Sequence, residues 1–328
     1  MTSAKMSGKI KNKNIFITGG TGFIASYLTQ RLIEQNKITL YDTCQRDALK
    51  YTDFAHHKNL TLIQGDVLDL PLLNKSMKKS DIVIHCAAIA GIYSVVKSPS
   101  LTLRVSFLGT YNALAAAVEN KVERFIDFST SEVYGPFVYK GTEDALTTQG
   151  PVGESRWSYA VGKLAAEHLS HSYHKEFGLA VTSIRPFNIY GPRQIGEGAV
   201  RGMILKAIKN EPIILYNDGS QIRAWCYVED FVDGALAIIP EPEAHGKVFN
   251  LGNPQGSITN FQLAQMIKRL ARSQSDIVFK KHPGPEVEIR VPSIERAETI
   301  LGFRPQIGLE EGIAQTIEWY RHHSTEAI

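Results

Sequence analysis

The segment at residues 14–24, Asn-Ile-Phe-Ile-Thr-Gly-Gly-Thr-Gly-Phe-Ile, constrains the fold of this chain more than any other. It opens with a short apolar run rich in β-branched residues, which predicts a buried parallel strand. A glycine-rich turn follows and leads into apolar residues at helical spacing, including Ala25, Leu28 and Leu32. Strand, glycine turn and helix in this order are typical of dinucleotide-binding proteins, because backbone without side chains lets a pyrophosphate approach a helix N-terminus. Many strand-to-helix turns that bind no nucleotide also use glycine, so the rest of the chain must decide.

Short apolar runs alternate with helical patterns through the first half of the chain, at 38–42, 60–64, 82–88, 125–128 and 180–184. This alternation predicts an α/β fold with a Rossmann-type, doubly wound parallel sheet. It breaks down later, where we expect strands at 213–216 and 222–228 around a turn at 217–220, a helix at about 229–239, a strand at 248–251, a helix capped by Thr259, an irregular segment at 284–292 and a helix at about 309–321. We therefore expect a Rossmann domain over residues 1–186, to which 223–251 return, and a smaller mixed α/β substrate lobe formed mainly by 187–222 and 252–328.

Candidate cofactor contacts lie at the ends of the expected strands. Asp42 ends the second strand, about 20 residues beyond the glycine turn, where an acidic residue binds the adenosine ribose of dinucleotides. A carboxylate there would repel a 2′-phosphate, so NAD is favoured over NADP; a turn aspartate is the alternative. Ala87 and Ala88 end the fourth strand and leave room for a cofactor, whereas His85 inside that strand is expected to be packed.

Tyr159 and Lys163 are four residues apart on an expected helix and therefore share one face. A lysine ammonium near a phenol favours phenolate and lowers its pKa. A phenolate beside a nicotinamide is a suitable base for an alcohol that loses hydride. The same spacing arises by chance on surface helices, so the pair alone decides nothing. Hydroxyl groups and a carboxylate follow the fifth expected strand at 129–132, where the reactive end of the cofactor should lie.

The composition excludes several other classes of protein. The chain has 328 residues, 43% of them hydrophobic, and a net charge of +3 from scattered charges, which argues against a nucleic-acid surface. We expect no membrane segment, because no uninterrupted apolar run is long enough and the start lacks a signal-peptide pattern. Three widely spaced cysteines favour neither disulfides nor a zinc site, so we expect no metal and a cytoplasmic location.

Together these motifs resemble the extended short-chain dehydrogenase/reductase family, which contains nucleotide-sugar epimerases, dehydratases and decarboxylases. The resemblance covers about residues 14–320 and includes Arg-Pro-Phe-Asn at 185–188, Tyr-Gly-Pro-Arg at 190–193 and Leu-Gly-Phe-Arg-Pro at 301–305. It implies an NAD-dependent enzyme with a nucleotide-sugar substrate, and among nucleotide sugars a UDP-sugar is the leading expectation. It also implies a homodimer formed through the helices expected near 106–119 and 158–177. Ser106 departs from the asparagine frequent in this family, although serine can still hydrogen-bond backbone there.

The resemblance also implies roles for individual residues. The implied cofactor contacts are Gly19, Gly22, Phe23 and Ile24 for the pyrophosphate, Asp42 for the ribose, Asp66 and Val67 beside adenine, and Ala87, Ala88, Tyr159 and Lys163. The implied catalytic residues are Thr130, Ser131, Glu132, Tyr159 and Lys163. The implied substrate contacts are Asn188, Arg193, Arg223 and Arg290, with solvated surface arginines as the alternative for the last two.

Glu132 is the residue that separates the reactions of this family. In the implied chemistry Tyr159 takes the proton of the sugar C4 hydroxyl during oxidation, and Thr130 or Ser131 hydrogen-bonds that oxygen. A glutamate beside the resulting ketone can remove the C5 proton, which suits dehydration. However, Ser131 replaces the aspartate of the commonest hexose 4,6-dehydratases. Thr-Ser-Glu resembles both some dehydratases of the GDP-sugar type and the UDP-glucuronate decarboxylases, while Arg-Trp at 156–157 and residues 290–294 resemble the bacterial UDP-glucuronate decarboxylases. We place dehydration first, decarboxylation second and 4-epimerisation third. A non-enzymatic NAD-binding redox sensor stays open, although such proteins typically lose the tyrosine or the lysine.

Overall fold

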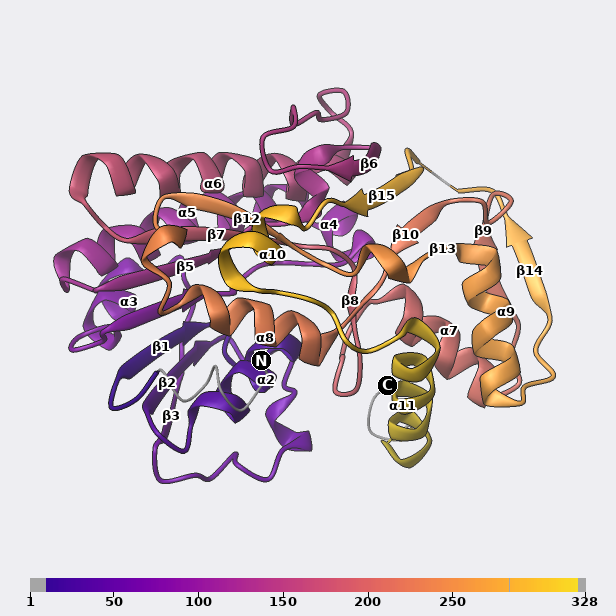
Figure 1. Ribbon diagram of the computed structural model, residues 1–328, viewed down its shortest axis with the longest axis horizontal. Helices are drawn as coiled ribbons and strands as arrows, with labels where there is room; N and C mark the ends of the chain where they lie inside the picture. The colour runs from indigo at the N-terminus through magenta and orange to yellow at the C-terminus, as the bar shows by residue number, and fades with distance from the viewer. Residues whose placement is uncertain (1–9, 283, 324–328) are drawn as a thin grey trace.

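The computed structural model describes residues 10–282 and 284–323, which form a large parallel sheet with a smaller lobe beside it (Figure 1). The central sheet has seven strands in the order β12-β7-β5-β4-β1-β2-β3, and all neighbouring strands are parallel. Their bounds are β1 Asn14–Thr18, β2 Lys37–Asp42, β3 Leu60–Gln64, β4 Ile82–His85, β5 Arg124–Phe128, β7 Val181–Pro186 and β12 Lys247–Leu251. The predicted doubly wound sheet is confirmed.

The strands of this sheet carry apolar side chains on both faces, and helices cover each face. In β1, Ile15 and Ile17 pack on one face beneath α2 and α8, while Phe16 packs on the other beneath α3 and α5. The α-helices are α2 Phe23–Leu32, α3 Leu70–Ser76, α4 Ile92–Lys97, α5 Pro99–Glu119, α6 Ser158–Phe177, α7 Ala199–Ile208, α8 Val228–Ile238, α9 Asn260–Ala271, α10 Glu295–Leu301 and α11 Leu309–His323. The 3₁₀ turns are η1 Leu49–Tyr51, η2 Ser131–Tyr134, η3 Ser155–Trp157, η4 Pro242–Ala244 and η5 Pro254–Gly256.

The strand order reverses between β1 and β4, where the chain crosses to the other half of the sheet. Ligands of open α/β sheets bind in the crevice at the carboxyl ends of the strands at such a switch point. The loops after β1, β2, β4 and β5 all reach this edge, so the fold gathers the candidate residues there.

The smaller lobe has its own core and three short sheets. Its core is formed by α7, α9 and α11 around residues such as Ile204, Ile267 and Ile317. The sheets are β13-β10-β15-β6, β11-β8 and β14-β9, with β6 Phe137–Gly141, β8 Ile189–Tyr190, β9 Ile213–Tyr216, β10 Ile222–Ala224, β11 Cys226–Tyr227, β13 Ser257–Thr259, β14 Ile277–Lys280 and β15 Ile289–Pro292. The predicted cap of α9 is confirmed, because the Thr259 hydroxyl accepts the Gln262 N–H in a capping box.

Two expectations about the second half are wrong. The strands on either side of the turn at 217–220 do not pair with each other: β9 pairs with β14, whereas β10 pairs with β13 and β15. The segment expected to be irregular contains β15. In addition, the helix expected from residue 106 begins at Pro99, and residues 222–228 are split between two short sheets. A local turn signal does not reveal partners that lie far away along the chain, which explains the first error.

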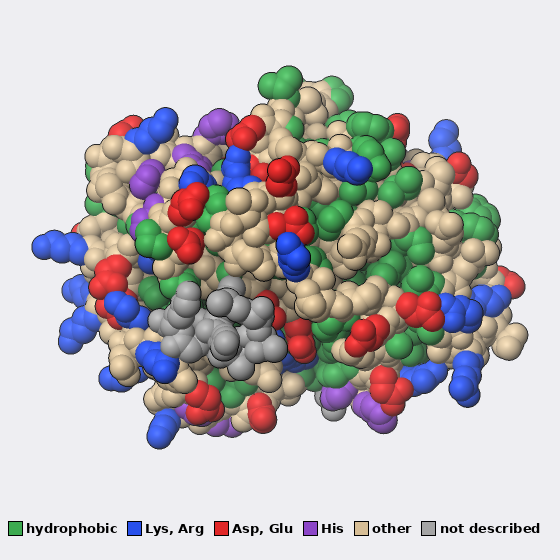
Figure 2. Space-filling model, viewed as in Figure 1, with side chains coloured by type: hydrophobic (Ala, Val, Ile, Leu, Met, Phe, Trp, Pro, Cys, Tyr) green, Lys and Arg blue, Asp and Glu red, His purple; other side chains and the backbone are tan. Residues whose placement is uncertain are grey.

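The surface shows both apolar and charged features. By length and composition α5 could cross a membrane, but half of its apolar window is buried, and core helices of soluble proteins pass the same test. Acidic and basic side chains are interspersed on the face shown in Figure 2.

Candidate active site

The turn after β1 is shaped for the close approach of a ligand. Gly19 has a φ of +65°, and a Cβ there would lie 2.8 Å from the backbone nitrogen of Ala87. Gly22 is the N-cap of α2 and provides no side-chain cap, so the first N–H groups of the helix, at Phe23 and Ile24, are open to an anion. This cradle, which a Cβ would fill, fits the pyrophosphate of a dinucleotide.

The expected adenosine contacts lie on the β2 and β3 side of the turn. The Asp42 carboxylate accepts the N–H groups of Thr21, at 3.1 Å, and Cys44, at 2.8 Å, which fixes it beside the glycine turn. Asp66 is exposed after β3, and Val67 is buried against α5, whose Asn112 amide donates to its carbonyl. These positions match a cofactor whose adenosine end lies over β2 and β3.

The end of β4 leaves space beside the turn, as expected. Ala87 and Ala88 are half-buried there, next to the glycine cradle. His85 is fully buried between the hydroxyls of Thr18 and Thr110, so the prediction that it is a packed residue is confirmed.

Tyr159 and Lys163 come from the first turns of α6 and meet the end of β5. The Lys163 ammonium is buried and donates to the carbonyl of Phe128 at 2.6 Å, and its burial lowers the pKa of Lys163. Tyr159 hydrogen-bonds the Thr130 side chain. Burial and the nearby Glu132 carboxylate raise the pKa of Tyr159, opposite to the lowering expected from Lys163. Burial of the phenol is the larger cause, and the Glu132 anion adds to it.

Glu132 is held as an anion by two arginines from distant parts of the chain. It lies in η2 directly after β5, where the Thr130 hydroxyl accepts its N–H at 3.1 Å. Arg290 of β15 donates to one carboxylate oxygen and, at 3.0 Å, to the carbonyl of Gly135, while an Arg156 nitrogen lies 3.1 Å from the other oxygen. Burial alone would raise the pKa of Glu132, but Arg290 and Arg156 together lower it to about 2.

A third arginine extends this cluster. Arg223 of β10 is the register neighbour of Arg290 and donates to the carbonyl of Val287 at 2.5 Å. Burial and the charge of Arg290 lower the pKa of Arg223 to about 10. The Nε atoms of Arg156 and Arg290 are buried and have no hydrogen-bond partner among the described residues. These N–H groups are donors that an anionic ligand could satisfy.

A buried polar network holds η2 in place. The Tyr134 hydroxyl accepts a hydrogen bond from Arg185 at 2.6 Å and donates to Asn250 at 2.9 Å. Arg185 is in turn paired with Glu167 of α6, its Nε lying 3.0 Å from the carboxylate. Because Tyr134 is two residues from Glu132, this network limits where the carboxylate can move.

The predicted substrate residues do not all come together. Arg223 and Arg290 join Glu132, and Asn188, between β7 and β8, donates its amide to the carbonyl of Ala224 at 3.0 Å. Arg193 lies elsewhere: its guanidinium is 3.5 Å from the ring centroid of Tyr27 and donates to Gln30, both on α2. The backbone at Arg193 is left-handed, with a φ of 63°, and its side chain points toward α2. The motif Tyr-Gly-Pro-Arg does not reveal this side-chain direction.

The sequence did not assign a role to Arg156, although the structure places it beside Glu132. Its position three residues before Tyr159, on the η3 turn that leads into α6, is the signal that could have identified it.

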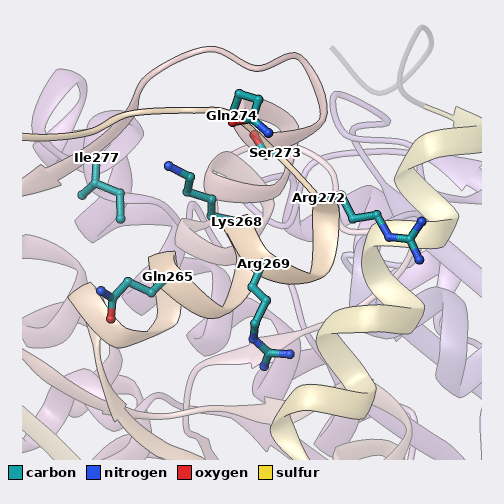
Figure 3. Close-up of a pocket in the computed structure, with 7 residues that line it drawn as sticks. All are labelled: Gln265, Lys268, Arg269, Arg272, Ser273, Gln274 and Ile277. Carbon is teal, nitrogen blue, oxygen red and sulfur yellow. The ribbon is translucent and has the colours of Figure 1, made fainter.

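The remaining described residues offer no better site. A hollow of about 430 Å³ lies at the end of α9, lined by Lys268, Arg269 and Arg272 among others (Figure 3). Cations at a helix carboxyl end complement the helix dipole, and this hollow is in the lobe, away from the glycine turn. Within residues 10–282 and 284–323, no group of three or more His, Cys, Asp or Glu is placed to hold a metal ion.

The chain is similar in sequence and fold to proteins of known activity. Residues 15–252 match the model of the NAD dependent epimerase/dehydratase family. A UDP-N-acetyl-α-D-glucosaminuronate decarboxylase of Bacillus cytotoxicus is 33% identical over 319 residues, which cover 94% of this chain and 98% of that protein. UDP-glucuronic acid decarboxylase 1 of Xenopus tropicalis is 35% identical over 315 residues, 94% of this chain and 72% of that protein. The solved UDP-glucuronic acid 4-epimerase of Bacillus cereus, in complex with UDP-glucuronic acid and NAD, is 26% identical with a TM-score of 0.87 and covers 94% of this chain and 99% of that one.

Proposed function

The chain belongs to the NAD-dependent epimerase/dehydratase family, and from that premise we propose that it decarboxylates a nucleotide-linked uronic acid, with a UDP-sugar as substrate. NAD is its cofactor, and modification of nucleotide sugars is its chemistry. The observation that carries the proposal is the pairing of Glu132 with Arg290 and Arg156.

This pairing disfavours dehydration, which the sequence alone placed first. Dehydration needs a base for the C5 proton, and a carboxylate whose pKa is lowered to about 2 is a weak base. One of its oxygens accepts a hydrogen bond from Arg290, and the other is ion-paired with Arg156 at 3.1 Å without a hydrogen bond. Decarboxylation needs no base at C5, because the electron pair that remains comes from the broken C5–C6 bond.

The charge of the cluster suits an anionic sugar. Arg156, Arg223 and Arg290 surround a single carboxylate, so three positive charges face one negative charge. A uronate on a nucleoside diphosphate brings negative charge at both C6 and the diphosphate. We assign the free Nε–H groups of Arg156 and Arg290 to the C6 carboxylate, and Arg223 to the diphosphate. The relatives named as decarboxylases of UDP-linked uronic acids support a uronate as the substrate class.

The residues of the site perform the reaction as follows. NAD, when bound, accepts a hydride from C4 and returns it at the end, so the redox balance closes within one turnover. Tyr159 takes the proton of the C4 hydroxyl as a phenolate, and Thr130 hydrogen-bonds the C4 oxygen. Burial and Glu132 raise the pKa of Tyr159 in the protein alone, so the positive charge of an oxidised nicotinamide would be needed to favour the phenolate. With a ketone at C4, the C5–C6 bond breaks, carbon dioxide leaves, and the electron pair moves onto the C4 oxygen as an enolate. Thr130 and protonated Tyr159 stabilise that enolate by hydrogen bonds until C5 takes up a proton from water. Tyr159 then gives its proton back to the C4 oxygen as the C4 hydroxyl is restored.

The test uses substrates that differ only at C6. The purified protein is incubated with UDP-glucuronate, its 2-acetamido analogue, UDP-glucose and dTDP-glucose, and the products are weighed by mass spectrometry. We expect loss of one carbon dioxide from the uronates and no change in the neutral sugars. Loss of one water from a neutral sugar would instead identify a dehydratase, and unchanged mass with a new retention time an epimerase. No turnover of any sugar would favour a redox sensor.

The Arg156→Met variant refines this test. We expect KM for the uronate to rise about tenfold or more, because one charge-assisted contact to the carboxylate is lost. Binding of UDP alone, measured by calorimetry, should stay unchanged, since Arg156 is assigned to C6. Equal weakening of UDP and UDP-uronate binding would contradict the assignment.

We also propose a homodimer formed through α5 and α6, which lie side by side in Figure 1. Both helices expose apolar side chains, including Phe107, Leu108 and Val161, beside an apolar hollow of about 300 Å³. Contiguous exposed apolar surface of this kind is typical of subunit interfaces.

We propose a cytoplasmic location for the protein. Cys44, Cys86 and Cys226 are all free thiols in the structure, which suits a reducing compartment. Microscopy of a fluorescently tagged chain tests this proposal, and an exported or organellar signal would contradict it.

A further inference from the structure

Three loops meet above the glycine turn. Arg46 lies in the loop after β2, residues 90–94 lead from β4 into α4, and Glu197 lies in the connector that follows β8. The contacts among them form what we call the strap, defined as Arg46, Ser94 and Glu197.

Arg46 reaches across from the β2 side to the β4 side. Its guanidinium donates to the carbonyl of Ala90 at 3.0 Å and to the Ser94 hydroxyl at 3.1 Å. Its own carbonyl accepts the hydroxyl of Thr21 at 3.0 Å, so its backbone is tied to the glycine turn below. Since β1 lies between β2 and β4 in the sheet, the side chain must pass over the turn of β1.

Glu197 closes the strap from the lobe side. Its carboxylate accepts the N–H groups of Tyr93, at 2.7 Å, and Ser94, at 2.9 Å, together with the Ser94 hydroxyl. One Arg46 nitrogen is 3.8 Å from the same carboxylate.

Two glycines with positive φ permit this close meeting. A Cβ on Gly91 would lie 2.6 Å from the Glu197 carboxylate carbon, and a Cβ on Gly196 would lie 2.8 Å from Nε of Arg46. The backbone is therefore built so that these three segments touch.

The lobe end of the strap is braced against other elements. The Tyr27 hydroxyl donates to the carbonyl of Pro192 at 3.1 Å, and Arg193 packs on the Tyr27 ring. The Tyr320 hydroxyl donates to the carbonyl of Gln194. These anchors fix the connector, so the half-exposed Arg46 side chain is the part that can move.

We propose that the strap closes over bound NAD and prevents its exchange during the catalytic cycle. A dinucleotide on this fold runs from the ends of β2 and β3, over the β1 turn, to the ends of β4 and β5. The strap is tied to Thr21 of the glycine turn and reaches the segment after β4, so it bridges the two sides of that path. Arg46 and Glu197 are thus positioning residues that gate the cofactor. The inference rests on NAD dependence alone and holds for any sugar reaction, because each of these reactions restores the oxidised cofactor.

The experiment measures cofactor exchange without any sugar. Holoprotein is moved into buffer that contains an enzyme destroying free NAD, and the protein-bound NAD is followed with time to give the release rate. Association is followed by tryptophan fluorescence after mixing apoprotein with NAD. We expect Arg46→Met to release NAD about tenfold faster, because charge-assisted contacts are lost. Association should also become faster, because a gate slows both directions.

Matched variants separate a gate from a general defect. Glu197→Gln should show a smaller increase than Arg46→Met, and the double variant should resemble Arg46→Met, because both residues act in one element. Arg269→Met removes an arginine that pairs with Glu310 on the lobe surface and should exchange NAD as the wild type does. Thermal unfolding in saturating NAD checks that each variant is folded. Release unchanged in folded Arg46→Met, or faster release without faster association, would overturn the proposal.

Discussion

At the scale of single residues, the Glu132–Arg290 pair sets the electrostatics of the site. A carboxylate in such a place would have a raised pKa from burial, yet its pKa is lowered to about 2, below the ordinary 4.5. Its ionisation therefore stabilises the fold above about pH 4.5, and this contribution is lost as the pH falls toward 2.

Replacement of Arg290 should make stability depend on pH in a new way. In Arg290→Met, mainly Arg156 is left to oppose the effect of burial on Glu132, so the pKa of Glu132 rises. The buried anion then destabilises the folded protein. We expect a loss of about 2–4 kcal/mol in unfolding free energy near pH 7 and a smaller loss near pH 4. Urea titrations at several pH values measure it.

The control for this prediction removes the anion as well. Glu132→Gln/Arg290→Met should be more stable than Arg290→Met near pH 7, because no unpaired charge stays buried. A loss that does not vary with pH, and that the second substitution does not reduce, would show that packing and not charge is responsible.

At the scale of elements, α5 and α6 approach closely at a glycine. A Cβ on Gly162 would lie 2.9 Å from Cβ of Ser106, next to the helix turn that carries Lys163. This contact fixes how α6 presents Tyr159 and Lys163 to the end of β5.

Two glycine-to-alanine variants should therefore change stability in opposite directions. We expect Gly162→Ala to destabilise the protein by about 1–3 kcal/mol through overpacking. Gly202 in α7 has nothing within 4 Å of a built Cβ, so Gly202→Ala should stabilise by about 0.4–1 kcal/mol through reduced chain entropy. Chemical denaturation compares the two, and stabilisation by both variants would mean that α5 and α6 have room to spare.

Elements differ in how far the sequence predicted them. The strands of the central sheet were predictable because each is a short apolar run bounded by turns, and their neighbours follow from alternation with helices. The sheet β13-β10-β15-β6 was not, because Arg223 and Arg290 interrupt its apolar residues and β15 pairs with β6, a strand more than a hundred residues earlier in the chain. Asp42 at the end of β2 and Lys163 on α6 could therefore be placed from the sequence, while the direction of Arg193 and the position of Arg156 beside Glu132 depended on tertiary packing.

At the scale of the whole molecule, the apolar face of α5 and α6 determines the expected assembly. Phe107 belongs to this face and is 38% exposed. Leu146, in the loop after β6, is 90% exposed and lies outside this face. We expect the wild type to sediment as a dimer and Phe107→Asp as a monomer, because a carboxylate would be buried in the interface without a partner.

Leu146→Asp is the matched control for this prediction and should leave the dimer intact. Sedimentation velocity with circular dichroism distinguishes dissociation from unfolding. A wild type that is monomeric at micromolar concentration, or a folded Phe107→Asp that stays dimeric, would exclude this face as the interface.

The separation between Glu132 and Arg290 also dictates when the protein can become active during its synthesis. The first five strands of the central sheet leave the ribosome with the glycine turn, Tyr159 and Lys163 close behind, whereas β12 and then β15 come more than eighty residues later. In a nascent chain without β15, Arg290 is missing, so Glu132 keeps only its ion pair with Arg156. The glycine turn, Tyr159 and Lys163 are thus translated well before Arg290, and the ion-pair cluster around Glu132 is complete only once β15 has been made.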